Sequence, residues 1–302
     1  MNIFEATGRT KKNLVQLALP IQKLKGDLKF PLYASEKLDG VYCVAMFYGK
    51  ETAEDSITIY SRTGEEYTSL NHLKKELYYL AAKTGTDFII FEAYIPHTPQ
   101  PIISGYCRDK KNQHQEVGAY IHDCLSIDEF NGEYITPYNR RYAELCDGIE
   151  RMCNQHIHLV EQHPVWSQRE IDKMVTEVYC HDGEGVVLRN PEASYSPGKR
   201  NSDILKIKRT VTYDLKVIAL EEGKGKYQNA CGKLICRWKD GKSIKVGSGL
   251  TDKQRRVWWS PLCYDDIVGK IVEIEAMAES SKGVLREPRF IGIRHDKIEG
   301  DF

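Results

Sequence analysis

The hydrophobic pattern of this sequence changes near Thr210. Before that residue, apolar runs of strand length alternate with stretches of helical spacing, such as 69–83, in which leucines recur at intervals of three and four. After it, strand-like runs separated by glycine-containing turns dominate, and a helical segment is expected only at 251–259. Because 302 residues also exceed the length of a typical single domain, we expect two domains, 1–209 and 210–302.

The first domain is expected to mix strands and helices. Its strands are expected at 31–47, 57–61, 87–95, 117–125, 184–189 and 204–208. Helices are expected at 69–83 with Ser69 as the N-cap, at 137–153, and at 168–181 after a capping box that begins at Ser167.

The second domain is expected to be almost entirely β-structure. Its strands are expected at 212–221, 231–238, 242–247, 269–279 and 288–294. Turns are expected at 223–226, 240–241 and 281–283. Five short strands with one helix are typical of a small β-barrel, and the OB-fold is the first model for it.

The composition excludes a disordered, fibrous or membrane-spanning chain. Hydrophobic residues make up 41% and charged residues 28%, as in globular proteins. No apolar run approaches the roughly 18 residues that a membrane span needs, and the N-terminus lacks a secretory pattern. The nine cysteines include no C-x-x-C pair, which favours reduced thiols over a disulfide framework or a zinc site. We therefore expect a soluble cytoplasmic protein.

Charge is balanced over the chain but unevenly distributed. The sequence has 43 basic and 43 acidic residues, yet 223–245 contains seven Lys or Arg and a single acid. Local basic stripes bind phosphate even when the whole chain is neutral. Solvated strand faces and turns would account for this cluster equally well, so charge alone permits a nucleic-acid partner without requiring one.

The most informative stretch is 33–42, which is centred on the tetrapeptide Lys37-Leu38-Asp39-Gly40. Alone, a K-x-D-G tetrapeptide is a weak signal. Its significance comes from five short motifs that follow it in order: S-R-T-G at 61–64, F-E-A at 91–93, E-G-V-V-L-R at 184–189, L-K-I-K at 205–208 and R-H-D-K at 294–297.

These residue types suit nucleotide chemistry. A lysine is a nucleophile only when neutral, and about one in 2,500 is neutral at pH 7 with an ordinary pKa, so Lys37 needs neighbouring cations or desolvation. Lys206 and Lys208 are two apart in a strand and share one face, where they could contact phosphate oxygens. Glu92 and Glu184 lie in apolar segments and need partners such as a lysine, ribose hydroxyls or a metal.

In their order and spacing, the motifs resemble those of the covalent nucleotidyltransferases, and among them the ATP-dependent DNA ligases. The resemblance implies an α+β fold, in which a nucleotidyltransferase (adenylation) domain of antiparallel sheets with flanking helices precedes an OB-fold domain. It implies a minimal enzyme of bacteriophage or viral type that seals nicks in duplex DNA with ATP and Mg²⁺ or Mn²⁺, through lysyl-AMP and DNA-adenylate. Such an enzyme would be a monomer in the infected host cell cytoplasm and act in DNA replication, repair or recombination.

The resemblance also implies roles for individual residues. The nucleophile would be Lys37, and the nucleotide would be bound by Ser35, Glu36, Arg62, Glu92, His122, Glu184, Lys206, Lys208, Arg294 and Lys297. Glu184 and Glu92 would hold the metal. Arg294 and Lys297 would orient pyrophosphate while the enzyme is adenylated.

Two positions depart from the family pattern. His122 stands where an aromatic residue often stacks on adenine, a role that an imidazole can take. Tyr42 stands where many viral relatives have an arginine that touches the nick phosphate. DNA contacts are instead expected from Arg62, Lys224 and Lys226, which would bind the backbone without reading sequence.

Three other functions share part of this pattern. An RNA ligase or an mRNA-capping guanylyltransferase would share the motif lysine, but the segment 246–255 resembles the OB domain of DNA ligases, and capping enzymes use GTP. A non-catalytic nucleic-acid-binding protein would form no covalent adduct, yet every motif lysine is present.

Overall fold

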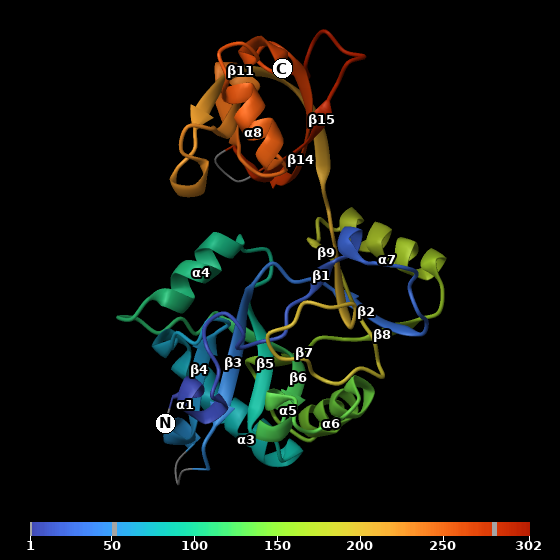
Figure 1. The fold of residues 1–302 in the computed structure, drawn as a ribbon. Coiled ribbons are helices and arrows are strands. Elements are labelled where there is room, and N and C mark those ends of the chain that lie inside the picture. The colour runs from blue at the N-terminus through green and yellow to red at the C-terminus, as the bar shows by residue number, and fades with distance from the viewer. Residues whose placement is uncertain (1, 50–52, 280–282) are drawn as a thin grey trace. The chain divides into compact units, whose positions relative to one another are not determined.

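The computed structural model describes residues 2–49, 53–279 and 283–302 (Figure 1). It divides into two compact units, Met1–Ile207 and Lys208–Phe302, each with its own apolar core. Residues 281 and 282 of the third expected turn lie outside the described residues. None of the described helices is long and apolar enough to cross a bilayer.

One sheet of the first unit is buried on both faces. Its strand order is β4 (Ile57–Ser61), β3 (Val41–Phe47), β5 (Phe88–Tyr94), β6 (Gly118–Leu125) and β7 (Ile157–Leu159), with only β6 and β7 parallel. Helices α3 (Lys74–Thr84), α4 (Gln100–Arg108) and α6 (Tyr138–Glu150) contribute to the core on one face. The other face packs against α1 (Ile3–Thr7) and α5 (Ile127–Asn131). Burial on both faces explains the continuous apolar runs in β5 and β6.

The second sheet of this unit carries the K-x-D-G turn. Its order is β1 (Leu19–Pro20), β10 (Ile204–Lys208), β9 (Gly185–Arg189), β2 (Leu32–Glu36) and β8 (His163–Val165). The strands β1 and β10 are parallel, and β2 is antiparallel to both β8 and β9. Helix α7 (Gln168–Cys180) lies beside this sheet (Figure 1). Its Ile171 and Met174 belong to the apolar core that the helix and the sheet share. In the β2–β9 register Glu36 faces Val186, which brings the residue after β2 beside the start of β9.

The second unit is a curled antiparallel sheet with one α-helix. Its order is β13 (Ser243–Val246), β12 (Cys231–Arg237), β11 (Val211–Glu222), β14 (Ile271–Glu279) and β15 (Leu285–Ile293). The N–H of Phe290 in β15 donates to the carbonyl of Ser248 at 2.9 Å, which joins the segment after β13 to the opposite edge. Trp258 of α8 (Asp252–Trp259) lies in the core against Phe290. The two units confirm the expected α+β domain of largely antiparallel sheets with flanking helices, followed by a small domain that is mostly β-structure.

Most strands and the later helices confirm the sequence-based expectations to within a few residues. The expected single strand at 31–47 is wrong: it is two strands, β2 and β3, which lie in different sheets on either side of the K-x-D-G turn. The expected N-cap at Ser69 is wrong: a 3₁₀ turn occupies Thr68–Leu73, α3 begins at Lys74, and the hydroxyl of Ser69 donates to the carbonyl of Cys107 at 2.8 Å. Elements without an advance signal are short: α1, α2 (Ala53–Ser56), α4, α5, β1, β7, β8 and the 3₁₀ turns Ile21–Lys23, Gly225–Tyr227, Lys239–Gly241 and Tyr264–Asp266.

Candidate active site

The side chain of Lys37 lies against a buried carboxylate. Its backbone N–H donates to the carbonyl of Gly185 at 2.8 Å, extending the β2–β9 pairing by one residue. That register places Nζ of Lys37 2.5 Å from Oε2 of Glu184, whose side chain is 6% exposed. The sequence argument expected cations around this amine, whereas the structure places an acceptor for its proton directly on it.

A glycine allows the K-x-D-G turn to pack on the neighbouring sheet. A Cβ at Gly40 would lie 2.5 Å from the carbonyl oxygen of Ala93 and 2.6 Å from Cγ of Glu92. Because Cβ atoms do not approach other atoms so closely, only glycine permits this contact. The turn therefore brings Lys37 and the carboxyl group of Glu92 on β5 into the same site.

The site has more carboxylates than cations. Burial raises the pKa of Glu92 to about 8; Lys37 opposes this shift, and Glu184 and Asp39 add to it. Protonation of Glu92 at neutral pH therefore relieves repulsion among three acidic side chains. A divalent cation would do the same, and hard carboxylate oxygens are the ligands that Mg²⁺ uses.

The described residues supply only part of a metal site. No group of three or more His, Cys, Asp or Glu side chains in this part of the chain is arranged to hold a metal ion. Mg²⁺ in phosphoryl-transfer sites is bound by one or two carboxylates together with substrate phosphates and water. Glu184 and Glu92 fit such a partial ligand set.

The positive charge of Arg62 acts on the carboxyl group of Glu92 in the same site. Arg62 is exposed in the turn after β4, and its charge lowers the pKa of Glu92. The turn is fixed by the hydroxyl of Ser61, which accepts the N–H groups of Thr63 at 3.2 Å and Glu65 at 3.0 Å. Gly64 has a φ of 79° and packs on the ring of Phe4, so this position also favours glycine.

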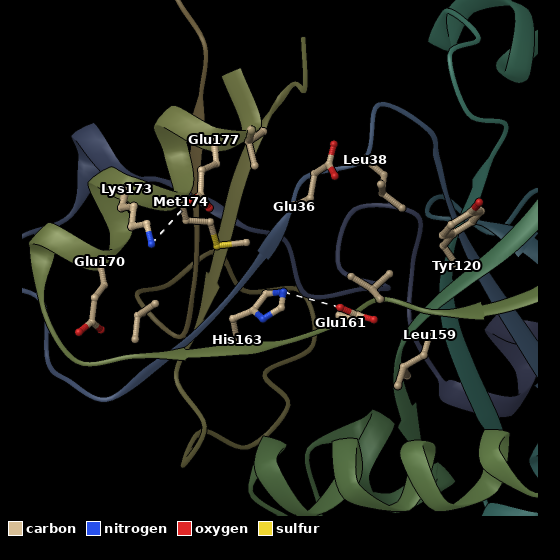
Figure 2. A pocket seen from close by; sticks show the side chains of 13 residues that line it. Glu36, Leu38, Tyr120, Leu159, Glu161, His163, Glu170, Lys173, Met174 and Glu177 are labelled. Atoms are coloured by element: carbon tan, nitrogen blue, oxygen red, sulfur yellow. Dashed lines mark ion pairs between the residues drawn. The ribbon is translucent and has the colours of Figure 1, made fainter. Parts of the chain in front are cut away.

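Glu36 and Leu38, the neighbours of Lys37, line a pocket of about 460 Å³. Figure 2 shows Met174 and Glu177 of α7 on one side of it and Tyr120 of β6 on the other. Ser35 is buried and precedes Glu36 in the strand, so the two side chains point to opposite faces. The structure therefore brings Glu36, but not Ser35, to this pocket.

His122 lies on β6 two residues beyond Tyr120, on the same face of the strand. Nη2 of Arg189 donates to its Nδ1 at 3.0 Å, and its ring lies 5.7 Å from that of Tyr42. Burial and the charge of Arg189 hold the pKa of His122 well below its usual range. The imidazole is therefore neutral, with its proton on Nε2. Tyr120, which lines the pocket, was not identified from the sequence. Its position two residues before His122 in an expected strand was the signal that could have predicted it.

A buried ion pair supports this face of the sheet. Asp123, next to His122, accepts from Nε of Arg141 at 2.8 Å and from Nη2 at 3.0 Å, and both side chains are almost fully buried. The pair ties α6 to β6. Neither it nor the His122 contact of Arg189 was expected from the sequence, because each joins residues far apart along the chain.

The two lysines of β10 share one side of the strand. The buried Leu205 alternates with Lys206 and Lys208, which are both partly exposed. Lys206 pairs in register with Pro20 of β1. Lys208 is the first residue of the second unit, and its Nζ lies 3.6 Å from Sδ of Met277.

The remaining candidates lie in the second unit at two separate places. Arg294 and Lys297 both contact the carboxylate of Asp214. Lys226 lies in the turn after β11 and forms an exposed ion pair with Asp252 at 2.8 Å, which raises the pKa of Lys226. Lys224 precedes it in the same exposed turn.

The fold and this lysine site define a nucleotidyltransferase domain joined to an OB-like domain. Residues 14–208 match the family model described as ATP dependent DNA ligase domain, and residues 222–294 match the DNA ligase OB-like domain. The first match alone covers more than half of the chain. The chain belongs to the ATP-dependent DNA ligase family.

Similar proteins support the same assignment. A DNA ligase of Methanococcoides burtonii is 38% identical over 283 residues, which cover 80% of this chain and 48% of that protein. A DNA ligase of African swine fever virus is 28% identical over 85% of this chain and 62% of that protein. A solved Lig E DNA ligase shares the fold, with a TM-score of 0.72 at 20% identity, over 93% of this chain and 98% of that one. The chain spans about half the length of the first curated relatives it matches.

Proposed function

We propose that this protein is an ATP-dependent DNA ligase that joins 5′-phosphate and 3′-hydroxyl ends at nicks in duplex DNA. The observation that carries the proposal is the contact between Lys37 and Glu184, within a chain that matches both ligase domain models. An amine held on a buried carboxylate beside two further acids is arranged for metal-assisted attack on a phosphate.

In the first step Nζ of Lys37 attacks the α-phosphorus of ATP. A nitrogen–phosphorus bond forms, the bond to the pyrophosphate oxygen breaks, and Nζ loses a proton, for which the carboxylate of Glu184 is within reach. Glu184 and Glu92 would hold Mg²⁺ or Mn²⁺, which offsets the charge on the transferring phosphoryl group. Lys206 and Lys208 contact the α-phosphate.

Other residues bind the remaining parts of the nucleotide. Glu36 faces the adenine edge, while the neutral ring of His122 lies near its face. Ser35 is buried, and we assign it a supporting role in β2 rather than a nucleotide contact. Arg294 and Lys297 bind and orient pyrophosphate.

In the later steps AMP moves to the 5′-phosphate of the nick, and the 3′-hydroxyl displaces it to form the phosphodiester. Arg62, Lys224 and Lys226 bind phosphates of the DNA, so the affinity for nicked DNA falls as salt rises. The nine free cysteines support a reducing compartment such as the cytoplasm. We further propose a monomeric enzyme of bacteriophage or viral type that acts in replication, repair or recombination.

A sealing assay tests the proposal. A nicked duplex with a labelled 5′-phosphate should be joined in the presence of ATP and Mg²⁺ but not with GTP. Substrates with RNA on either side of the nick serve as the comparison. Joining of RNA only, or an enzyme–GMP adduct without an AMP adduct, would contradict the proposal.

A further inference from the structure

Two cations of the C-terminal motif share one nearly buried carboxylate. Asp214 lies in β11, and its side chain is 9% exposed. Nη1 of Arg294 lies 3.1 Å from its Oδ1 and 3.0 Å from its Oδ2, and Nζ of Lys297 also contacts Oδ2. A carboxylate so poorly hydrated requires these partners.

The backbone of Asp214 holds the same segment at its far end. The N–H of Asp301 donates to the carbonyl of Asp214 at 2.7 Å, and the N–H of Asp214 donates to Oδ2 of Asp301 at 2.8 Å. A Cβ at Gly300 would lie 2.8 Å from the same carbonyl oxygen, so glycine permits this approach. The residues 294–301 therefore form a loop that is tied to Asp214 at both ends.

The guanidinium of Arg294 keeps a donor for a further anion. Its Nε and Nη2 donate to Asp296 at 2.9 and 2.7 Å, and its Nη1 donates to Asp214. A guanidinium has five N–H donors. Among the described residues Nη1 contacts both oxygens of Asp214, so these four contacts leave one donor, on Nη2. The ammonium of Lys297 likewise has three donors, of which Asp214 takes one. Both cations are thus fixed in place without being saturated.

We propose that Asp214 is a positioning residue for enzyme adenylation, which fixes Arg294 and Lys297 so that their remaining donors bind the pyrophosphate of ATP. The inference rests on the proposed function. Arginine and lysine side chains have more rotamer freedom than most residues. A shared anchor removes that freedom before ATP binds, and the N–H donors that Asp214 and Asp296 leave unused can bind an anion. The opposite possibility, that Asp214 sequesters the cations, predicts faster adenylation when its charge is removed.

The test compares Asp214→Asn with Asp265→Asn, which alters an exposed carboxylate of the same unit. The measurements are the rate of Lys37–AMP formation as a function of ATP, its reversal by pyrophosphate, and sealing of a pre-adenylated nick. In Asp214→Asn we expect formation and reversal to fall about tenfold with a raised KM for ATP, and pre-adenylated sealing to stay near wild type. Asp265→Asn should match wild type in all three assays.

A double variant separates positioning from general folding. If Asp214 acts through the two cations, Asp214→Asn should add little to the loss already caused by Arg294→Ala with Lys297→Ala. Asp301→Ala, which removes only the exposed tail contact, should slow adenylation in the same direction and gives the readout if Asp214→Asn does not fold. Unchanged or faster adenylation, or equal losses in all assays, would overturn the inference. A wild-type protein that forms no AMP adduct would instead overturn the proposed function.

Discussion

Nζ of Lys37 lies 2.5 Å from Oε2 of Glu184, across the pairing of β2 with β9. Residues 147 positions apart meet because Glu36 pairs with Val186 and the next backbone N–H bonds to Gly185. The contact orients the amine toward the carboxylate of Glu184. Nucleophile and carboxylate are thus set by strand register rather than by a flexible loop.

Replacing the carboxylate should therefore impair the chemistry more than the fold. In Glu184→Gln the amide keeps the size of the side chain but neither accepts a proton nor binds a metal as well. We expect enzyme adenylation to slow by about 10²-fold or more. The measurement is the single-turnover rate of AMP adduct formation with ATP and Mg²⁺. Glu133→Gln, at an exposed position of the same unit outside the pocket, is the control, and equal rates for the two variants would contradict a role for Glu184.

Gly40 offers a test of the close approach between the turn and β5. In Gly40→Ala the new Cβ would meet the carbonyl oxygen of Ala93, so the turn must shift away from Glu92. We expect a loss of about 1–3 kcal/mol in the free energy of unfolding together with slow adenylation. Gly105→Ala, in α4 with open space around it, should be neutral or slightly stabilising. A fully active, stable Gly40→Ala protein would show that this contact is not needed.

The Asp123–Arg141 pair is expected to be a major source of stability in the first unit. Asp123→Ala leaves the guanidinium of Arg141 buried without its carboxylate, which should cost about 3–5 kcal/mol. Urea denaturation measures the change. Replacement of Lys173, in its exposed ion pair with Glu177, should leave the midpoint nearly unchanged. Similar effects for the two sites would contradict this assignment.

Stability should depend on pH through His122. Burial and Arg189 lower the pKa of His122 in the folded state, whereas in the unfolded chain it is about 6.5. Below that pH, His122 is protonated in the unfolded chain but not in the folded protein. The free energy of unfolding therefore decreases by up to about 1.4 kcal/mol for each unit by which the pH is lowered. The loss begins near the unfolded pKa and ends at the folded one. In His122→Asn, the side-chain Oδ1 can accept from Arg189, and the contribution of His122 to the pH dependence of the free energy of unfolding between pH 7 and pH 5 should disappear. An unchanged pH dependence would contradict this role of His122.

The sequence predicted the elements with strong local signals. The apolar run 87–95 and the cap at Ser167 identified β5 and the start of α7. Ser69 misled because its hydroxyl bonds to Cys107 across the fold rather than to the helix that follows. Strands such as β7 and β8 have three residues each, too few for any periodicity.

The candidate site likewise has a part that the sequence predicted and a part that it did not. The motif pattern pointed to Lys37, Glu92 and Glu184, and the structure brings these three together. The sequence could not identify the acidic partners of the basic motif residues, such as Asp214, which forms an ion pair with Arg294. Such pairs depend on which strands become neighbours, and a hydrophobic pattern does not specify which acid will meet which base.

The central claim is tested most directly by mass spectrometry of the protein after incubation with ATP and Mg²⁺. The account predicts a single added AMP, located on Lys37 by peptide mapping and released by pyrophosphate. Lys37→Ala should stay unmodified while remaining folded, with a lower unfolding midpoint because the nearly buried Glu184 loses its partner. An adduct on another residue, or an intact Lys37 that stays unmodified under these conditions, would contradict the account.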